Sequence, residues 1–396
     1  MINEKMEALG RQSSVIRALF EYGKKRKAEI GNDNVFDFSI GNPSIPAPEI
    51  VNDTIRELVN TMDPVVLHGY TSAAGDMSVR KVLAENIKRR FGTEAKPELI
   101  YMTCGAAASL TISLNAICLP GEEVIVIAPY FPEYKVFIEK AGAKVIEVPS
   151  RIPDFQLDLE AVEKAINAGT KAVIINSPNN PTGAVLSAGT ISKLSELLNR
   201  KQKEFGHEIF IIADEPYREL VYGGAEVPYI PEFYDNTIVC YSYSKSLSLP
   251  GERIGYIFVS PKCADAGSVY AAVCGAGRAL GFVCAPSLLQ FTVARCCNVT
   301  SDIARYDENR AYFYKALTDI GYEVVPPDGA FYLFVKALEP DANAFSEKAK
   351  ERELLLVPSD SFGFKGYVRI SYCVTKEQIE RSIPAFRKLY EDYQEK

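Results

Sequence analysis

The chain has 396 residues, of which 47% are hydrophobic and 24% are charged. This composition is typical of a folded globular protein and excludes a disordered or fibrous chain, and at roughly 150 residues per domain the length predicts two to three domains. The 44 Lys and Arg residues against 51 Asp and Glu residues give a net charge of −7, which argues against a nucleic-acid-binding protein, because such proteins carry a basic excess.

Histidine and cysteine usage narrows the chemistry further. The two histidines, His68 and His207, are too few for a histidine-rich metal site. The nine cysteines form an odd set without a Cys-x-x-Cys pair, which indicates reduced thiols in a cytoplasmic protein. The N-terminal segment lacks the apolar core of a signal peptide, and no uncharged apolar run reaches about 18 residues. We therefore expect a cytoplasmic protein with no membrane span and no metal site.

Short runs rich in Val and Ile alternate with amphipathic runs through the middle of the chain. This alternation predicts an α/β fold with a largely parallel sheet. About a dozen residues separate 242 from 254, too few for a crossover helix, so the last strand is expected to run antiparallel. The predicted strands are 99–103, 123–128, 144–148, 171–176, 208–213, 237–242 and 254–259, and the predicted helices are 107–118, 134–141, 159–168 and 188–205.

The last third of the chain predicts a smaller α+β domain. One long helical stretch is expected near 287–317, followed by strands and a closing helix. Residues 36–40 are expected to fold back onto this domain. The predicted boundaries are an N-terminal arm at 1–45, a large domain at 46–300 and a small domain at 301–396, whose strands are 322–325, 330–335, 354–357 and 367–372 and whose helix is 376–393.

Ligands of open α/β sheets bind beyond the carboxyl ends of the strands, and the first such end is rich in small residues. Gly105, Ala106 and Ala107 open a helix after strand 99–103. Backbone N–H groups at such a turn can bind a phosphate, although small residues also simply let a helix pack closely on a sheet.

Aromatic and amide side chains follow the next strands. Tyr130, Phe131 and Tyr134 come after strand 123–128, where they could stack on a flat ring or pack in the core. Two asparagines, Asn179 and Asn180, follow strand 171–176 in a turn-forming segment. Their amides are candidates for ligand contacts because of their place at a strand end.

Charged residues follow the last two parallel strands. Asp214 comes after an apolar strand, so its carboxylate needs a partner, which could be an arginine, a helix N-terminus or a cationic ligand nitrogen. Lys245 follows strand 237–242, and Arg253 lies eight residues further on. A lysine that is partly desolvated and flanked by cations becomes a nucleophilic amine, although a lone loop lysine is more often solvated. Together the strand ends offer what pyridoxal phosphate requires: a lysine, an acid for the ring nitrogen and donors for the phosphate.

Four segments carry a resemblance to the fold-type-I pyridoxal-phosphate enzymes of the class I/II aminotransferase family, aspartate/aromatic aminotransferase-like. They are Asn-Ser-Pro-Asn-Asn-Pro-Thr-Gly at 176–183, Asp-Glu-Pro-Tyr at 214–217, Ser-Tyr-Ser-Lys to Gly-Glu-Arg-Ile-Gly-Tyr at 242–256, and Tyr-Val-Arg-Ile-Ser at 367–371. The resemblance covers nearly the whole chain. It implies a large domain with a mostly parallel, mixed seven-stranded sheet flanked by helices, plus a small α+β domain.

The resemblance also implies a role for each matching residue. Lys245 would form the internal aldimine with pyridoxal 5′-phosphate, and Asp214 would pair with the ring nitrogen. Phe131 would stack on the ring, and Asn180 and Tyr217 would hydrogen-bond its hydroxyl. The phosphate would be held by Ser242, Ser244, Arg253, the backbone of Gly105, Ala106 and Ala107, and Tyr70 of a neighbouring subunit.

The implied activity moves an amino group between an L-amino acid and a 2-oxo acid by a ping-pong mechanism, with aspartate or aromatic amino acids as candidate substrates. Arg369 would bind the substrate α-carboxylate as a two-pronged ion pair, with Gly41 covering it and Asn180 beside it. The resemblance further implies a homodimer with shared active sites.

Two questions stay open at this stage. Arg278, in a glycine-rich segment expected to be a mobile loop, lies near where relatives place an arginine for a distal carboxylate, and a solvated loop arginine is the equal alternative. A carbon–sulfur β-lyase or an amino-acid decarboxylase could use the same site. A third class, a non-catalytic binding protein, is disfavoured by the intact lysine, acid and phosphate set.

Overall fold

A seven-stranded sheet forms the centre of the computed structural model, which describes residues 2–11 and 14–395. Strand β8 runs antiparallel to both of its neighbours, and the other strand pairs are parallel. The predicted mixed sheet and its antiparallel strand are thus confirmed. In sheet order the strands are β2 (Ile100–Thr103), β8 (Gly255–Val259), β7 (Thr237–Ser242), β6 (Phe210–Asp214), β5 (Thr170–Asn176), β3 (Glu123–Ala128) and β4 (Lys144–Pro149).

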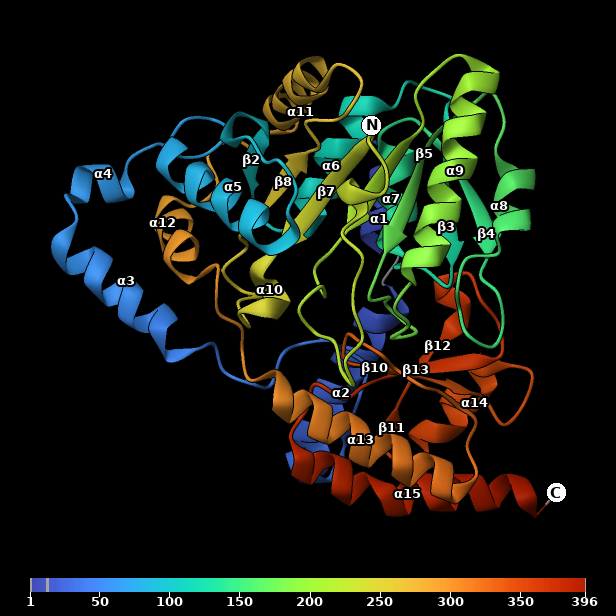
Figure 1. The fold of residues 1–396 in the computed structure, drawn as a ribbon. Coiled ribbons are helices and arrows are strands. Elements are labelled where there is room, and N and C mark those ends of the chain that lie inside the picture. Colours follow the sequence, from blue (N-terminus) through green and yellow to red (C-terminus); the bar gives the residue numbers. More distant parts are fainter. Residues whose placement is uncertain (1, 12–13, 396) are drawn as a thin grey trace.

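Helices cover both faces of this sheet (Figure 1). Apart from β4 at the edge of the sheet, the strands are largely buried because their Val and Ile side chains meet apolar helix faces on each side. One face packs against α5 (Met77–Phe91), α8 (Leu159–Ala165), α9 (Ala188–Phe205) and α12 (Ser287–Cys296). The other face packs against α6 (Ala106–Ile117), α7 (Glu133–Lys140) and α11 (Ala266–Leu280).

A second, four-stranded antiparallel sheet lies below the first (Figure 1). In order its strands are β12 (Val357–Pro358), β13 (Tyr367–Ser371), β10 (Tyr332–Lys336) and β9 (Val324–Val325). The helices that accompany it are α13 (Ile303–Ile320), α14 (Ala342–Lys350) and α15 (Lys376–Gln394). This α+β arrangement is the predicted one, whereas the boundaries at residues 45 and 300 stay predictions.

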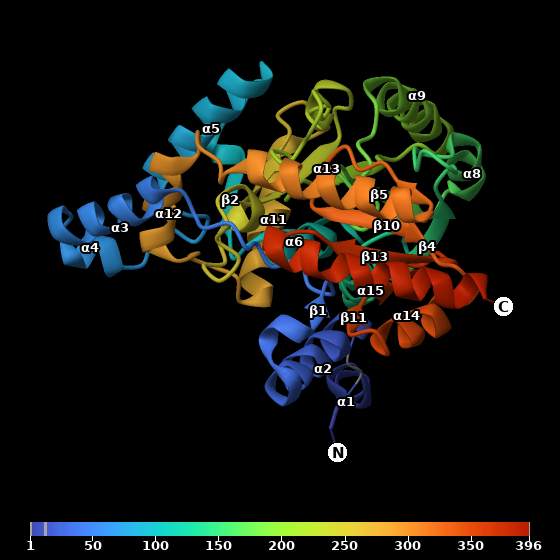
Figure 2. The same cartoon turned by 90° about the horizontal axis from the view of Figure 1, so that it is seen from below.

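The N-terminal part of the chain folds back onto this smaller sheet region, as expected. Strand β1 (Phe36–Asp37) pairs in parallel with β11 (Leu354–Leu355), and Figure 2 shows both strands beside α2 (Val15–Ile30). Helix α1 (Glu4–Arg11) precedes α2. The remaining helices are α3 (Glu49–Thr61), α4 (Pro64–His68) and the single-turn α10 (Tyr243–Ser246). Residues 1, 12, 13 and 396, which belong to the predicted arm and small domain, lie outside the described residues.

Two predicted elements are divided in the structure. The expected helix 287–317 was wrong: α12 ends at Cys296 and α13 begins at Ile303. Between them the Ser301 N–H donates to the Ser246 carbonyl at 2.7 Å, and Asn, Thr and Ser side chains compete with helical hydrogen bonds. The expected strand 354–357 is split between β11 and β12, which belong to different sheets.

All nine cysteines are free thiols. Within residues 2–11 and 14–395, no helix is long and apolar enough to cross a membrane. The same residues contain no group of three or more His, Cys, Asp or Glu side chains that could hold a metal ion.

Candidate active site

A cavity of about 280 Å³ lies between the two sheets, at the carboxyl ends of β5, β6 and β7. Side chains from both sheets and from the N-terminal segment line it. Twelve of the fifteen predicted site residues are in this lining: Gly41, Ala106, Ala107, Phe131, Asn180, Asp214, Tyr217, Ser242, Ser244, Lys245, Arg253 and Arg369.

Asp214, the last residue of β6, supplies a buried carboxylate that is 4% exposed. Its Oδ2 accepts a hydrogen bond from the Tyr134 hydroxyl, and the Asn176 amide donates to its backbone carbonyl at 2.9 Å. Its Oδ1 is buried and has no hydrogen-bond partner in the structure. Burial raises the pKa of Asp214 to about 7, although the Tyr134 hydrogen bond acts against the increase. A buried carboxylate oxygen without a partner favours a cationic ligand atom beside it.

Lys245 lies in α10, directly after β7. This one-turn helix begins where the Ser242 hydroxyl accepts a hydrogen bond from the Ser244 N–H at 3.2 Å. The Lys245 Nζ donates to the Gly41 carbonyl at 2.7 Å. Burial is the main cause that lowers the pKa of Lys245 to about 8; Cys373 opposes this decrease, and the positive charges of Arg369 and Arg253 contribute to it. The amine is therefore partly neutral near pH 8 and able to act as a nucleophile.

A set of donors faces the cleft at the end where α6 begins. The Arg253 Nη1 donates to the Ser244 hydroxyl at 3.1 Å and to the Pro250 carbonyl at 3.0 Å. Gly105 caps α6 with φ = +85°, and a Cβ at this position would lie 2.6 Å from the Arg253 Nη2. The first N–H groups of a helix lack partners within the helix and carry a partial positive charge. Because Ala106 and Ala107 line the cleft here, this end suits a phosphate group.

A second arginine lies at the opposite side of the cleft, on β13. Arg369 is 2% exposed, its Nη1 donates to the Asn180 side-chain oxygen at 3.1 Å, and its Nη2 donates to the Ser39 carbonyl. Its guanidinium lies 4.6 Å from the Tyr332 ring centroid, and its Nε is buried without a partner. A guanidinium held in this way can bind a carboxylate with two parallel hydrogen bonds.

Aromatic groups complete the lining. The Tyr217 and Tyr332 hydroxyls are hydrogen-bonded at 2.8 Å, and burial raises the pKa of Tyr217 well above its usual value. The Phe131 ring meets the Tyr134 ring edge-on, with 5.7 Å between centroids. At Gly41 a Cβ would lie 2.2 Å from the Tyr332 hydroxyl oxygen, so this close approach requires glycine.

Three predicted residues lie outside the cavity lining. Gly105 adjoins it through the Arg253 guanidinium. Tyr70 is 99% exposed, and Arg278 is an exposed residue in the last turn of α11. The expected mobile loop at Arg278 was wrong, since this residue lies in a helix. Gly277 packs closely against Tyr101, and this contact favours the helix despite the small residues around it.

Several lining residues were not predicted. Asn176 could have been found, because it begins the quoted Asn-Ser-Pro-Asn segment. Nothing in the sequence marked Tyr332, whose place depends on how β10 pairs with β13. The other additional lining residues are Ile16, Ile40, Leu110, Pro216 and Pro250.

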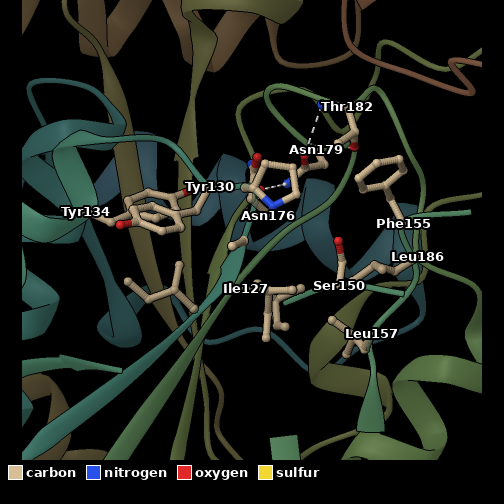
Figure 3. A pocket seen from close by; sticks show the side chains of 14 residues that line it. Ile127, Tyr130, Tyr134, Ser150, Phe155, Leu157, Asn176, Asn179, Thr182 and Leu186 are labelled. Carbon is tan, nitrogen blue, oxygen red and sulfur yellow. Dashed lines mark hydrogen bonds between the residues drawn. The ribbon is translucent and has the colours of Figure 1, made fainter. Parts of the chain in front are cut away.

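A second cavity lies on the far side of Asn176 and is also lined by Tyr130 and Tyr134 (Figure 3). Its volume is about 30 Å³, which is enough for about one water molecule. The larger cavity is therefore the one of the two that can hold a substrate.

The comparison with known families explains this arrangement. The sequence model of the aminotransferase class I and II family matches residues 33–386. The chain belongs to the class I and II aminotransferases.

Two relatives match nearly end to end. The aspartate aminotransferase of Thermotoga maritima is 30% identical over 374 residues, 93% of this chain and 95% of the relative. The aromatic-amino-acid aminotransferase 2 of Thermococcus litoralis is 28% identical over 390 residues, 96% of each chain.

Solved structures agree with this assignment. An amino transferase from Eubacterium rectale is 60% identical, with a TM-score of 0.97 over 99% of each chain. The aspartate aminotransferase of Thermus thermophilus with maleate is 26% identical, with a TM-score of 0.86 over 98% of this aminotransferase and 99% of that chain. The protein is thus a transaminase, and the predicted family, fold and enzyme class are confirmed. The comparisons do not favour the lyase or decarboxylase alternative.

Proposed function

We propose that this aminotransferase binds pyridoxal 5′-phosphate in the large cavity and moves an amino group between an L-amino acid and a 2-oxo acid in two half-reactions. The buried, unpartnered Asp214 Oδ1 carries the proposal. It shares one cavity with the Lys245 amine and with the donors around Arg253. A pyridine nitrogen, an aldehyde and a phosphate on one molecule would match these three groups.

The bound cofactor would supply an electron sink at its protonated ring. Asp214 would keep that ring nitrogen charged, and Phe131 would pack against the ring. Asn180 and Tyr217 would hydrogen-bond the ring hydroxyl. Lys245 would hold the cofactor covalently through its Nζ and, as a free amine, would carry the proton of the substrate α-carbon. Ser242, Ser244, Arg253, the backbone around Gly105, Ala106 and Ala107, and Tyr70 of a second copy would bind the phosphate.

The substrate α-carboxylate binds to Arg369, whose unpartnered Nε leaves capacity for a further acceptor. Gly41 and Asn180 lie beside it in the lining. The Gly41 carbonyl accepts a hydrogen bond from the Lys245 amine, so Gly41 lies beside the amine that would hold the cofactor. The names of the relatives support aspartate and aromatic amino acids as the first substrates to test.

The proposed assembly is a homodimer with shared active sites. Helices α3 and α4 project from the rest of the chain (Figure 1), and they expose apolar side chains such as Val59, Val65 and Val66. An exposed apolar arm favours burial against another molecule. Tyr70 follows α4 and is almost fully exposed, as a residue that reaches the phosphate of a second copy should be. The nine free thiols support a cytoplasmic location.

The test begins with the absorbance spectrum of the purified protein before and after borohydride, followed by mass spectrometry of the peptide that contains Lys245. We expect a cofactor mass on that lysine. Single amino acids should then convert the spectrum to that of the amine form of the cofactor, and a 2-oxo acid should reverse the change.

Three outcomes would contradict the proposal. Absence of cofactor on Lys245 after loading would remove the cofactor assignment. Release of ammonia with pyruvate would indicate a lyase, and release of carbon dioxide would indicate a decarboxylase.

A further inference from the structure

The two oxygens of the Asp214 carboxylate have different surroundings. Oδ2 accepts the Tyr134 hydroxyl, and the Asn176 amide nitrogen lies 3.5 Å from the same oxygen. Oδ1 is buried and has no partner. Asp214 lines the large cavity, whereas Tyr134 does not. Any effect of Tyr134 on a molecule bound in the cavity is therefore transmitted through Asp214, because Tyr134 itself would not contact that molecule.

Tyr134 lies on a helix that packs against the sheet to which the Asp214 strand belongs. It lies in the first turn of α7 and is 2% exposed. Burial raises the pKa of Tyr134 well above its usual value, so the hydroxyl keeps its proton and acts as a donor. A donor fixed to one carboxylate oxygen restricts rotation of the carboxylate and makes it a weaker base.

We propose that Tyr134 is a positioning residue. By binding Oδ2 it leaves Asp214 Oδ1 free for the cofactor ring nitrogen, and it keeps the proton between Asp214 and the ring on that nitrogen. The inference rests on the proposed function. A weaker base on the protein side leaves the proton on the ring side, and the charged ring is the form that accepts electrons.

Other titratable groups also face Asp214. The Glu215 charge raises the pKa of Asp214, but Glu215 is itself paired with Arg218, whose Nε donates to it at 2.5 Å. Tyr217 and Cys240 lie close enough to Asp214 to interact electrostatically with it. Among these titratable groups, Tyr134 is the one that donates a hydrogen bond to the Asp214 carboxylate.

The chain provides a matched control in Tyr130. Its ring stacks on the Tyr134 ring with 6.4 Å between centroids (Figure 3), and it is 5% exposed. Its hydroxyl donates to a different carboxylate, Glu147 Oε1, at 2.9 Å. Tyr130→Phe and Tyr134→Phe thus each remove one tyrosine hydroxyl from the same cluster, and Tyr134→Phe removes the one bound to Asp214.

The first test titrates Asp214 in the cofactor-free full chain. Carboxyl ¹³C NMR of aspartate-labelled protein follows the titration, with Asp214→Asn assigning the signal. Tyr134→Phe should raise the pKa of Asp214 by about one to two pH units, because a hydrogen bond to a charged group is worth roughly that much. Tyr130→Phe should leave it unchanged. An unchanged value in Tyr134→Phe, or an equal change in both variants, would overturn the inference.

The second test uses the holoenzyme loaded with ¹⁵N-labelled pyridoxal phosphate. The ring-nitrogen resonance should move towards the position of neutral pyridine in Tyr134→Phe and stay in place in Tyr130→Phe. A resonance that does not move in Tyr134→Phe would refute the role of Tyr134. If the wild-type protein bound no cofactor, the proposed function would fall, while the cofactor-free titration would still decide whether Tyr134 controls Asp214.

A third measurement covers the case in which Tyr134→Phe fails to fold. Incorporation of 3,5-difluorotyrosine at position 134 keeps the ring in place and makes its hydroxyl a stronger donor. The pKa of Asp214 should then fall below the wild-type value. A rise, or no change, would contradict the inference.

Discussion

The two walls of the active-site cavity are built in different ways. On the wall proposed to bind the cofactor, called the cofactor wall below, Asn176, Asp214 and Ser242 are the last residues of the neighbouring strands β5, β6 and β7. On the wall proposed to bind the substrate carboxylate, called the carboxylate wall below, Gly41 follows β1, while Tyr332 and Arg369 belong to the smaller sheet. The first wall is thus fixed by one hydrogen-bonded ladder, and the second is assembled from segments far apart in the chain.

This difference teaches where each wall obtains its rigidity. The ladder fixes the cofactor wall directly, since Asn176 is paired in register with Asp214. The carboxylate wall depends on single tethers, such as the Ser371 N–H, which donates to the Phe38 carbonyl at 2.9 Å. The Lys245–Gly41, Arg369–Asn180 and Tyr217–Tyr332 hydrogen bonds join the two walls. We therefore expect substitutions in the first wall to change cofactor binding and substitutions in the second wall to change substrate binding.

The largest effect is expected at Lys245, one of the residues that join the walls. Lys245→Ala should lower kcat by about 10⁴-fold or more, because it would remove both the proposed nucleophile and the proposed proton carrier. Stopped-flow absorbance of each half-reaction would measure this loss. Cofactor should still bind, but borohydride should no longer fix it to the protein. Activity within tenfold of the wild type would show that another group moves the proton.

The carboxylate wall is tested by replacing its buried guanidinium. Arg369→Leu should lower kcat/KM for amino acids by about 10²- to 10³-fold, as expected for loss of one partner of a buried charge pair. Arg369→Lys should recover little of this, because an ammonium cannot form the two parallel hydrogen bonds. Cofactor affinity should stay within about twofold of the wild type. A large loss of cofactor affinity would mean that the two walls are not independent.

The phosphate end of the cofactor wall is expected to give a smaller effect. Arg253→Ala should weaken cofactor affinity by about tenfold, as expected for one charge-assisted hydrogen bond, and should make that affinity less sensitive to salt. Fluorescence titration of the cofactor-free protein would measure both. If KM for the amino acid changed and cofactor affinity did not, Arg253 would belong to the substrate side.

The lowered pKa of Lys245 predicts a pH dependence of the cofactor-free protein. The usual lysine pKa is 10.5, whereas the folded chain holds Lys245 at about 8. Between these values the unfolded chain binds the proton and the folded chain has released it, so the free energy of unfolding should rise with pH from about 8 to 10.5. Lys245→Met should flatten this rise in a denaturant titration. The control variant Lys262→Met, at a residue more exposed to solvent, should retain it.

The smallest expected effect concerns Arg278. If Arg278 binds the distal carboxylate of a substrate across the proposed dimer, Arg278→Ala should lower kcat/KM for aspartate and glutamate by about tenfold and leave phenylalanine unchanged. Steady-state kinetics with the three amino acids would measure this. Unchanged values for aspartate and glutamate would make Arg278 a solvated helix residue.

Sequence reasoning worked best where local patterns decide the structure. The strands of the large sheet begin and end within two residues of the predicted bounds, because they are short, rich in Val and Ile, and bounded by turn residues. The carboxyl ends of the parallel strands share one edge, so the sequence alone predicts that the residues at or just beyond these ends lie close together. Asp214, Lys245 and Arg253 were found in this way.

It was weakest where placement depends on packing between distant segments. The Tyr134 hydroxyl reaches Asp214 across 80 positions of sequence, and Tyr332 enters the cavity through a strand pairing that no local pattern specifies. The break between α12 and α13 depends on a hydrogen bond to the α10 segment. The roles of Tyr70 and Arg278 involve a second copy of the chain and stay predictions.

The antiparallel course of β8 has a consequence for how this enzyme can change. Because no crossover helix separates β7 from β8, Lys245 and Arg253 lie on one short connection, and Arg253 hydrogen-bonds back to Ser244. The length of this connection therefore sets the distance between the Lys245 amine and the proposed anion site at Arg253. Insertions in other loops would leave that distance unchanged, whereas an insertion in this connection would displace both residues relative to each other.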